Sequence, residues 1–314
     1  MARFSVVIPL YNKRKDIEKT MASLLAQSFS DFEVIIVNDG STDNSGNVVK
    51  TFVDPRIKLF SKKNEGVALT RNFGVEKATA EHIVFLDADD YWHTDHLMNL
   101  NSLVEEFPEH SWYATAYEKQ HHSKMITTIV SPIMEKKEWR GIVSDYFKNS
   151  LADPLAWTSA VCMKKKFFME LNGFDPTITN GAGEDTDLWI RAALASPLIF
   201  STRATARHNL DGSNRISHIP ANKRVFFSPD KYEIFTAEKP YLKKYLDINR
   251  FSLAIQHRLA KDSQSFKEYF NKIDLKNLNP KQRLLLKQPR SLLILLIRIK
   301  TFFEFFGKRL SPYK

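Results

Sequence analysis

Short apolar runs alternate with amphipathic stretches through the first 90 residues of the chain. The apolar runs are rich in β-branched and aromatic residues, as is typical of buried strands. The stretches between them have the spacing of apolar positions that is expected of helices. The alternation predicts an α/β fold with a mainly parallel central sheet flanked by helices. The expected strands are 4–9, 32–38, 57–60 and 82–86, and the expected helices are 15–27, 44–52 and 66–77.

Polar residues directly follow three of these strands. Tyr11 and Asn12 come after the first strand, Asp39 closes the second, and the run from Asp87 to Asp90 follows the fourth. In open α/β sheets, ligands bind outside the carboxyl ends of the strands. We therefore expect these three strand ends to meet at one crevice.

The pattern changes farther along the chain. A further strand is expected at 112–117, and the polar stretch at 120–122 is expected to form a loop or a hairpin. After about residue 217 the periodicity becomes helical and the sequence more basic. We therefore predict two domains, an α/β domain at 1–216 and a mainly helical C-terminal extension at 217–314, with the boundary near 216–220.

The last part of the extension, at about 290–310, has an amphipathic pattern. On a helix, Arg290, Arg298, Thr301, Glu304 and Lys308 share one face. Apolar residues with flanking cations suit a helix that lies on anionic lipid, which we favour, although a helix packed on the catalytic domain with solvated cations fits the same pattern. The opposite face carries Leu292, Leu295, Leu296, Ile299, Phe302, Phe303 and Phe306.

The net charge of +10 is concentrated in this tail. Residues 280–314 contain nine Lys and Arg but a single acid, Glu304, a balance of +8 that leaves +2 for the rest of the chain. This distribution points to an anionic membrane surface rather than to nucleic acid. The single cysteine, Cys162, the lack of a signal-peptide pattern, and the lack of an apolar run of about 18 residues predict a cytoplasmic protein, peripheral on the inner face of the membrane.

The run Asp87-Ala88-Asp89-Asp90 places three carboxylates where a buried strand leaves the sheet. Mg2+ and Mn2+ prefer carboxylate oxygen and bridge readily to phosphates, so we expect a divalent metal here. An acidic helix N-terminus is the alternative.

Two further motifs have a ligand interpretation and a structural one. Asp39 can accept hydrogen bonds from a base or ribose, although a strand-turn-helix of this kind is more often structural. Arg71 lies in the segment from Asn64 to Asn72, a polar turn that enters a helix. Its guanidinium can reach a diphosphate or can form a surface salt bridge.

In this order and spacing, the motifs resemble those of family 2 inverting glycosyltransferases of the GT-A fold. The matching segments are 5–12, 38–43, 64–72 and 87–90, and the resemblance covers roughly residues 3–215. It implies a Rossmann-like GT-A domain in that part of the chain, before the helical extension that the periodicity predicts. It also implies that Pro9, Tyr11 and Asp39 contact the nucleotide, that Asp87 contacts the ribose or metal, and that Asp89 binds the metal. The predicted donor site is completed by Asn12, Asn64, Gly66, Arg71 and Ala88.

A later stretch, from Gly183 to Arg191, matches the same family. There the resemblance implies that Asp185 is the general base, that Glu184 and Trp189 lie on the acceptor side, and that His208 completes the metal site. Without the resemblance, Glu184 and Asp185 would be acids that open a helix, and His208 would be a solvated loop residue. The acceptor is expected to meet residues 153–160 and the loop after Thr177.

The resulting prediction is an inverting, metal-dependent enzyme that moves one sugar from a nucleotide-sugar, expected to be a UDP-sugar, to a hydroxyl of a glycan or lipid-linked acceptor. Related proteins of this size commonly build bacterial surface polysaccharide or lipopolysaccharide. Processive members of the wider family that the chain resembles carry a Gln-x-x-Arg-Trp motif after the base, and no such motif follows Asp185, so the resemblance implies single additions. A non-catalytic sugar-nucleotide-binding module and a Rossmann oxidoreductase are the alternatives, but the latter requires a GxGxxG turn where this chain has Pro9-Leu10-Tyr11-Asn12.

Overall fold

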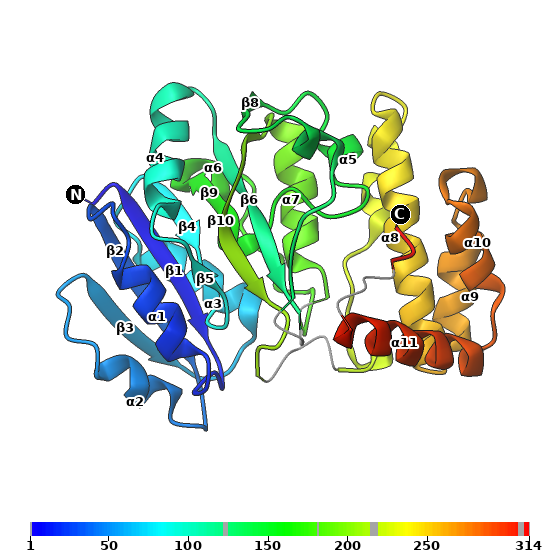
Figure 1. Ribbon diagram of the computed structural model, residues 1–314, viewed down its shortest axis with the longest axis horizontal. Helices are drawn as coiled ribbons and strands as arrows, with labels where there is room; N and C mark the ends of the chain where they lie inside the picture. The colour runs from blue at the N-terminus through cyan, green and yellow to red at the C-terminus, as the bar shows by residue number, and fades with distance from the viewer. Residues whose placement is uncertain (1, 122–124, 181, 214–218, 307–310, 314) are drawn as a thin grey trace.

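The computed structural model describes residues 2–121, 125–180, 182–213, 219–306 and 311–313. Within them the chain forms a 10-stranded sheet whose main order is β3-β2-β1-β4-β9-β6-β10-β5 (Figure 1). The five strands expected from the sequence are all present, within a few residues of the expected ends. They are β1 (Phe4–Leu10), β2 (Phe32–Asp39), β3 (Ile57–Lys62), β4 (His82–Phe85) and β6 (Trp112–Gln120).

The sheet is mainly parallel because its long strands run in one direction. β1 pairs in parallel with both β2 and β4, and β2 pairs in parallel with β3. β9 (Val161–Lys164) runs against β4 and β6, and β10 (Ile199–Asn209) is parallel to β6. The polar stretch after β6 leads into a hairpin with β7 (Ile126–Thr128), while β5 (Tyr91–Trp92) and β8 (Arg140–Ile142) pair with β10.

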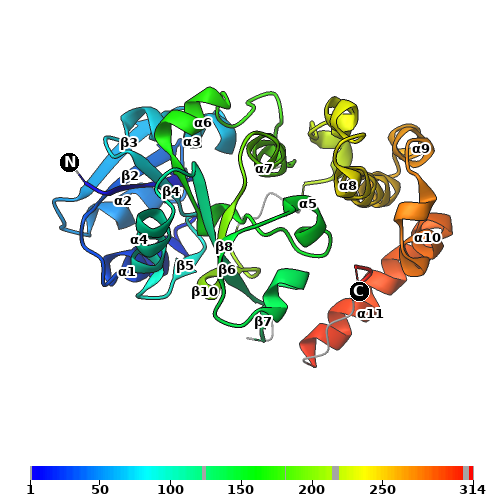
Figure 2. The same ribbon diagram turned by 90° about the horizontal axis from the view of Figure 1, so that it is seen from above.

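Helices cover both faces of this sheet (Figure 2). Helix α3 begins after Gly66, whose φ of +94° favours glycine. It packs so closely on β1 that a side chain at Gly74 would collide with Val7. The helices on one face are α3 (Val67–Lys77), α6 (Lys165–Glu170) and α7 (Glu184–Ala195), and those on the other include α1 (Ile17–Leu25) and α4 (His96–Glu106). The short helices α2 (Ser45–Lys50) and α5 (Tyr146–Asn149) complete this part of the chain.

The C-terminal region is helical, as expected, but its first helix shares the main core. α8 buries Leu242, Tyr245, Leu246 and Leu253 in the same apolar cluster as the sheet. A second, smaller cluster lies between α8, α9 and α10 around Phe251. The predicted domain boundary at 216/217 lies outside the described residues. The elements of this region are the 3-10 helix η5 (Pro229–Phe235) and the helices α8 (Pro240–Leu259), α9 (Ser263–Asn271), α10 (Pro280–Lys287) and α11 (Arg290–Phe305).

The last helix, α11, agrees with the amphipathic stretch expected from the sequence. It lies across the end of the helical region, away from the sheet (Figure 1). Leu293 is buried. Most of the apolar face is exposed, including Leu295, Phe302 and Phe303. α11 therefore does not use this face to pack on the α/β region. None of the helices in the described part of the chain is long and apolar enough to cross a membrane.

Candidate active site

The carboxyl ends of β1, β2 and β4 open into one pocket of about 380 Å³. The first turns of α3 and α7 contribute its other walls, so the expected convergence of strand ends is present. Twelve of the predicted site residues line this pocket, namely Pro9, Tyr11, Asp39, Asn64, Gly66, Arg71, Asp87, Ala88, Asp89, Glu184, Asp185 and His208.

Asp39, at the end of β2, organises the turn that leads into α3. Its two carboxylate oxygens accept hydrogen bonds from the backbone N–H groups of Glu65 and Gly66, each at 3.0 Å. The ammonium of Lys62 lies 3.0 Å from the same carboxylate. Each carboxylate oxygen can accept more than one hydrogen bond, so Asp39 can still meet a ligand while it shapes the pocket wall.

Arg71 is buried between two acids of the pocket. One nitrogen of its guanidinium lies 2.7 Å from Asp87 and another lies 3.0 Å from Glu184. Burial by itself would lower the pKa of Arg71. The charges of Asp87 and Glu184 raise this pKa by more than burial lowers it, so the guanidinium stays charged. Burial, and then the charge of Asp185, raise the pKa of Glu184. Arg71 is thus a buried bridge between β4 and α7 instead of a surface salt bridge.

Asp89 and Asp90 have different surroundings although they are adjacent in the chain. The Asp89 carboxylate forms an ion pair of 2.6 Å with Lys13. Asp90 is buried and accepts hydrogen bonds from Trp157 and Ser159 at 3.0 and 2.6 Å. Burial, and then the charges of Asp89 and Asp87, raise the pKa of Asp90 to about 8. Of these two neighbours, Asp89 thus pairs with a cation that lines the pocket, whereas Asp90 is held by neutral donors.

Trp157 contacts both His208 and Asp90. The His208 and Trp157 rings stack with their centroids 3.9 Å apart. Trp157, in turn, is held by its hydrogen bond to Asp90, and the backbone N–H of Asn209 donates to the same carboxylate at 2.9 Å. His208 is therefore presented at the pocket by ordered neighbours rather than by a solvated loop.

The predicted metal ligands Asp87, Asp89 and His208 share the pocket, but they do not form a cage. No group of three His, Cys, Asp or Glu side chains within the described ranges is close enough to hold a metal ion by itself. Asp87 is engaged by Arg71 and Asp89 by Lys13. Mg2+ is commonly held by only one or two carboxylates together with waters and substrate phosphates, and Asp89 is a carboxylate of this pocket that could serve in that way.

The first turn of α7 carries three acids with distinct partners. Glu184 pairs with Arg71, and Asp187 pairs with Arg191 at 2.8 Å. Asp185 is partly exposed and accepts a hydrogen bond from the backbone N–H of Thr186 at 2.6 Å. Among the described residues it has no ion pair, so its carboxylate is the one that remains open to the pocket.

Two predicted site residues are placed elsewhere. Asn12 lines a neighbouring cavity, where its side-chain oxygen accepts a hydrogen bond from the backbone N–H of Thr42 at 2.7 Å. Trp189 is a core residue, since its ring is fully buried and stacks on Trp112 at 6.1 Å. Trp189 follows Asp185 by about one turn of α7, but its ring is not among the described side chains that line the pocket, and its expected place on the acceptor side stays a prediction.

The sequence interpretation missed Lys13 and Thr70 as pocket residues. Lys13 follows Tyr11 and Asn12 directly, so its position after the first strand was an available signal. Thr70 precedes Arg71 but carries no charge that would single it out. The segments expected to meet the acceptor do reach the pocket, through Trp157 and Asn180.

Comparisons with known proteins agree with the motifs. Residues 5–148 match the family described as glycosyl transferase family 2. An uncharacterized glycosyltransferase of Rickettsia felis is 27% identical over 282 residues, which are 85% of this chain and 42% of that protein. The uncharacterized glycosyltransferase YibD of Escherichia coli is 43% identical over 90 residues, 28% of this chain and 26% of that protein. The chain thus spans less than half the length of these curated relatives.

Solved structures show the same fold. The crystal structure of Staphylococcus aureus TarS in complex with UDP-GlcNAc has a TM-score of 0.59 at 19% sequence identity, covering 87% of this chain and 72% of that chain. The TarS complex with UDP has a TM-score of 0.58 at 17% identity, covering 88% and 89% of the two chains. The resemblance in three dimensions extends beyond the stretch matched by the family, and it establishes a GT-A-like architecture.

Proposed function

We propose that this chain, in which residues 5–148 match glycosyl transferase family 2, transfers a single sugar from a UDP-sugar to a hydroxyl of a glycan or lipid-linked acceptor, with inversion at the anomeric carbon. The relatives named above are glycosyltransferases, and one structural neighbour was crystallised with UDP-GlcNAc. Both facts support a nucleotide-sugar donor for this chain.

One observation carries the proposal. A single pocket contains both the strand-end residues expected to bind a nucleotide diphosphate and Asp185, a carboxylate without an ion pair among the described residues. A donor and an acceptor can therefore meet within reach of one base. A pure binding module needs the first set of groups but has no use for the second.

The reaction follows from these groups. Asp185 accepts the proton of the acceptor hydroxyl while that oxygen forms a bond to the anomeric carbon. The bond from the anomeric carbon to the diphosphate oxygen breaks at the same time, and its electron pair leaves with UDP. A single displacement needs one base and inverts the configuration. Lys13 and the charged Arg71 lie on the pocket side where the diphosphate is expected, and their charge favours the anionic leaving group.

A divalent metal is part of this proposal. Asp89 and His208 are the residues that would hold Mn2+ or Mg2+, and the donor phosphates and waters would supply the other ligands. The metal would neutralise charge that develops on the diphosphate. Lys13 contacts Asp89 at 2.6 Å, so the ammonium would have to share or leave this carboxylate when the metal binds.

The lipid-linked acceptor and the inner face of the cytoplasmic membrane are also part of the proposal. Both rest on α11, which carries exposed apolar side chains together with the cations Arg290, Arg298 and Lys300. Apolar side chains beside cations suit binding at an anionic lipid surface. An acceptor anchored in that surface would then be presented to a peripheral enzyme.

The decisive experiment combines binding and turnover. UDP and a panel of nucleotide sugars would be titrated by calorimetry with Mn2+ and with EDTA, and UDP release would be followed for each donor. We expect Mn2+-dependent binding of UDP and slow hydrolysis of one preferred UDP-sugar. Asp89→Asn should lose the Mn2+ dependence, whereas Asp95→Asn, at the start of α4 outside the pocket, should behave as wild type.

Each part of the proposal can fail separately. No binding of any nucleotide sugar would reject the transferase. Tight binding that never leads to UDP release, even with glycan acceptors, would favour the binding module. Binding that is equal in Mn2+ and EDTA would reject the metal and leave Lys13 and Arg71 as the cations of the site.

A further inference from the structure

A segment of the C-terminal region lies directly against the loop that leads to Asp185. The backbone N–H of Thr179 donates to Val225 at 3.1 Å, and the backbone N–H of Phe227 donates to Ala182 at 3.2 Å. Arg224 and Asn180 add a side-chain contact of 3.1 Å between the same two stretches. The loop before α7 is therefore held along its length by residues 224–227.

The ring of Phe227 covers the residue from which α7 begins. Gly183 has a φ of +94°, which L side chains rarely adopt, and a Cβ added there would lie 2.7 Å from the Phe227 ring. Glycine is thus required both by the backbone conformation and by the close approach of this ring. The start of α7 is fixed from outside the α/β region.

The 3-10 helix η5 adds a contact inside the first turn of α7. The hydroxyl of Tyr232 donates a hydrogen bond of 2.5 Å to one carboxylate oxygen of Asp187, and Arg191 donates to the other oxygen at 2.9 Å. Asp187 is 2% exposed, so these partners replace water. Burial, and then the hydrogen bond to Asp187, raise the pKa of Tyr232, which keeps the hydroxyl protonated as a donor.

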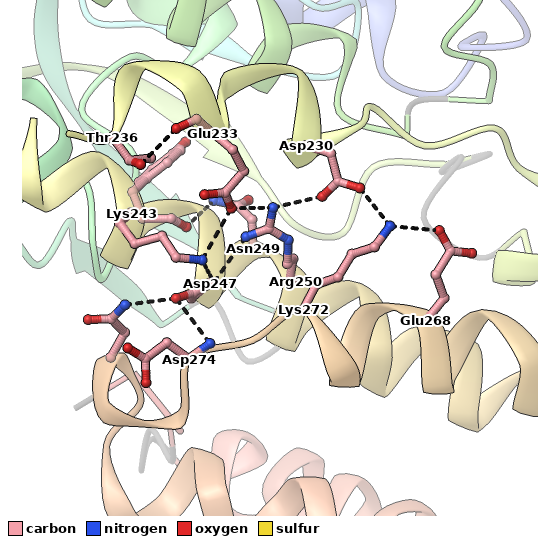
Figure 3. A network of polar contacts seen from close by, with 12 residues as sticks. Asp230, Glu233, Thr236, Lys243, Asp247, Asn249, Arg250, Glu268, Lys272 and Asp274 are labelled. Carbon is pink, nitrogen blue, oxygen red and sulfur yellow. Dashed lines mark hydrogen bonds and ion pairs between the residues drawn. The ribbon is translucent and has the colours of Figure 1, made fainter. Parts of the chain in front are cut away.

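A polar network anchors η5 to α8, as Figure 3 shows. Arg250, 1% exposed, lies 2.7 Å from Asp230 and 2.5 Å from Glu233 of η5, and 3.0 Å from Asp247 of α8 itself. Lys272, directly after α9, approaches Asp230 to 2.7 Å. Because Arg250 itself is buried, loss of one of these acids would leave its charge with fewer partners where water does not reach, so the network helps to keep η5 in place.

We propose that Tyr232 is a positioning residue for Asp185, through which the C-terminal helices hold the catalytic base in register with the donor. The inference rests on the proposed role of Asp185. It assigns to η5 and α8 a part in the reaction, although neither η5 nor α8 lines the pocket in the described structure. A base must be held within a fraction of an ångström of its productive position, and a misplacement of about 1 Å can lower the rate about 100-fold.

The first test needs no activity. Tyr232→Phe removes one hydroxyl and keeps the ring, and Tyr269→Phe is the matched control in α9, where the ring stacks on His257 at 5.5 Å. Hydrogen exchange of the amides at 178–190 would be measured in both variants. We expect exchange at least about 10-fold faster in Tyr232→Phe and unchanged in Tyr269→Phe. Equal exchange in all three proteins would overturn the proposal.

The second test separates positioning from general stability. With the preferred donor, Tyr232→Phe should lower kcat about 10-fold and change the donor KM less than about 2-fold. In an Asp185→Asn background the same substitution should have no further effect, because the group that it positions is gone. An equal loss in both backgrounds, or a kcat within 2-fold of wild type, would overturn the role.

The two tests also distinguish this inference from the proposed function. If the wild-type protein releases no UDP from any donor, the proposed function fails and with it the role of Asp185. If the wild-type protein is active but Tyr232→Phe changes neither exchange nor kcat, only the positioning role fails.

Discussion

Helices α1 and α11 have the same kind of amphipathic sequence but treat their apolar side chains differently. α1 buries Ile17, Met21 and Leu24 completely in the core beside the sheet. α11 buries Leu293, while Leu295 is 51% exposed and Phe302 is 61% exposed. An amphipathic pattern therefore predicts a helix in both places, but it does not say which surface covers the apolar face.

The difference between α1 and α11 corresponds to two different roles within one chain. The α/β region encloses its apolar side chains and opens a polar pocket at the strand ends. α11 lies along one side of the C-terminal helices (Figure 1) and leaves apolar side chains exposed. We therefore predict that substitutions in the α/β region change chemistry or stability, and that substitutions in α11 change attachment to a surface.

The largest expected effect is on chemistry. Asp185→Asn should lower kcat at least about 100-fold, because the acceptor hydroxyl loses its base, while UDP affinity stays within about 2-fold. Steady-state UDP release and calorimetry would measure the two quantities. The same variant should bind liposomes as wild type does. Full activity would move the base to Glu184 or Asp187, and the separation of the two regions would then need a different chemical centre.

The second effect is on stability and uses a matched pair of leucines. Leu24→Ala in α1 should lower the free energy of unfolding by about 2–5 kcal/mol, because it leaves a cavity in the core. Leu295→Ala in α11 should change it by less than about 0.5 kcal/mol, since this side chain already meets solvent. Urea unfolding of both variants provides the comparison. A similar cost at both positions would show that the α11 face is buried in solution.

The third effect concerns the surface that α11 meets. Leu295→Asp should weaken sedimentation with phosphatidylglycerol liposomes about 10-fold, because it places a negative charge in the apolar face. Leu284→Asp, at a 61% exposed leucine of α10, is the matched control and should have little effect. Binding should also fall as salt is raised. Wild-type protein that does not sediment, or variants that behave alike, would contradict the membrane role.

The smallest effect is a pH dependence confined to the α/β region. Burial lowers the pKa of His82 from 6.5 to about 4. A folded-state pKa below the unfolded value contributes stability that is present above pH 6.5 and is lost as the pH falls toward 4. Acidification from pH 7 to 5.5 should therefore cost about 1 kcal/mol at this residue. Thermal unfolding of His82→Leu across this range should show a shallower dependence, and an equal slope would contradict the assignment.

The predictions that came true depend on patterns within single segments. The strands, the helices around them and the polar residues at the strand ends follow from local periodicity and from the rule for parallel sheets. The sequence therefore predicts that Tyr11, Asp39 and Asp87 lie at one crevice, and they line one pocket. Trp189 follows Asp185 by one helical turn, and only the packing of its ring against Trp112 shows that it is a core residue.

Sequence alone determined the βα order, the motifs that resemble those of family 2 glycosyltransferases, and two amphipathic helices at opposite ends of the chain. The tertiary structure decided which side chains from distant parts of the chain contact each other. Arg71 meets Glu184 across 113 positions, and Tyr232 meets Asp187 across 45. Such pairs depend on how distant helices pack on a common core, and short-range periodicity carries no information about that packing. The same reason separates α1 from α11, since only the packed fold shows which apolar face finds a partner within the chain.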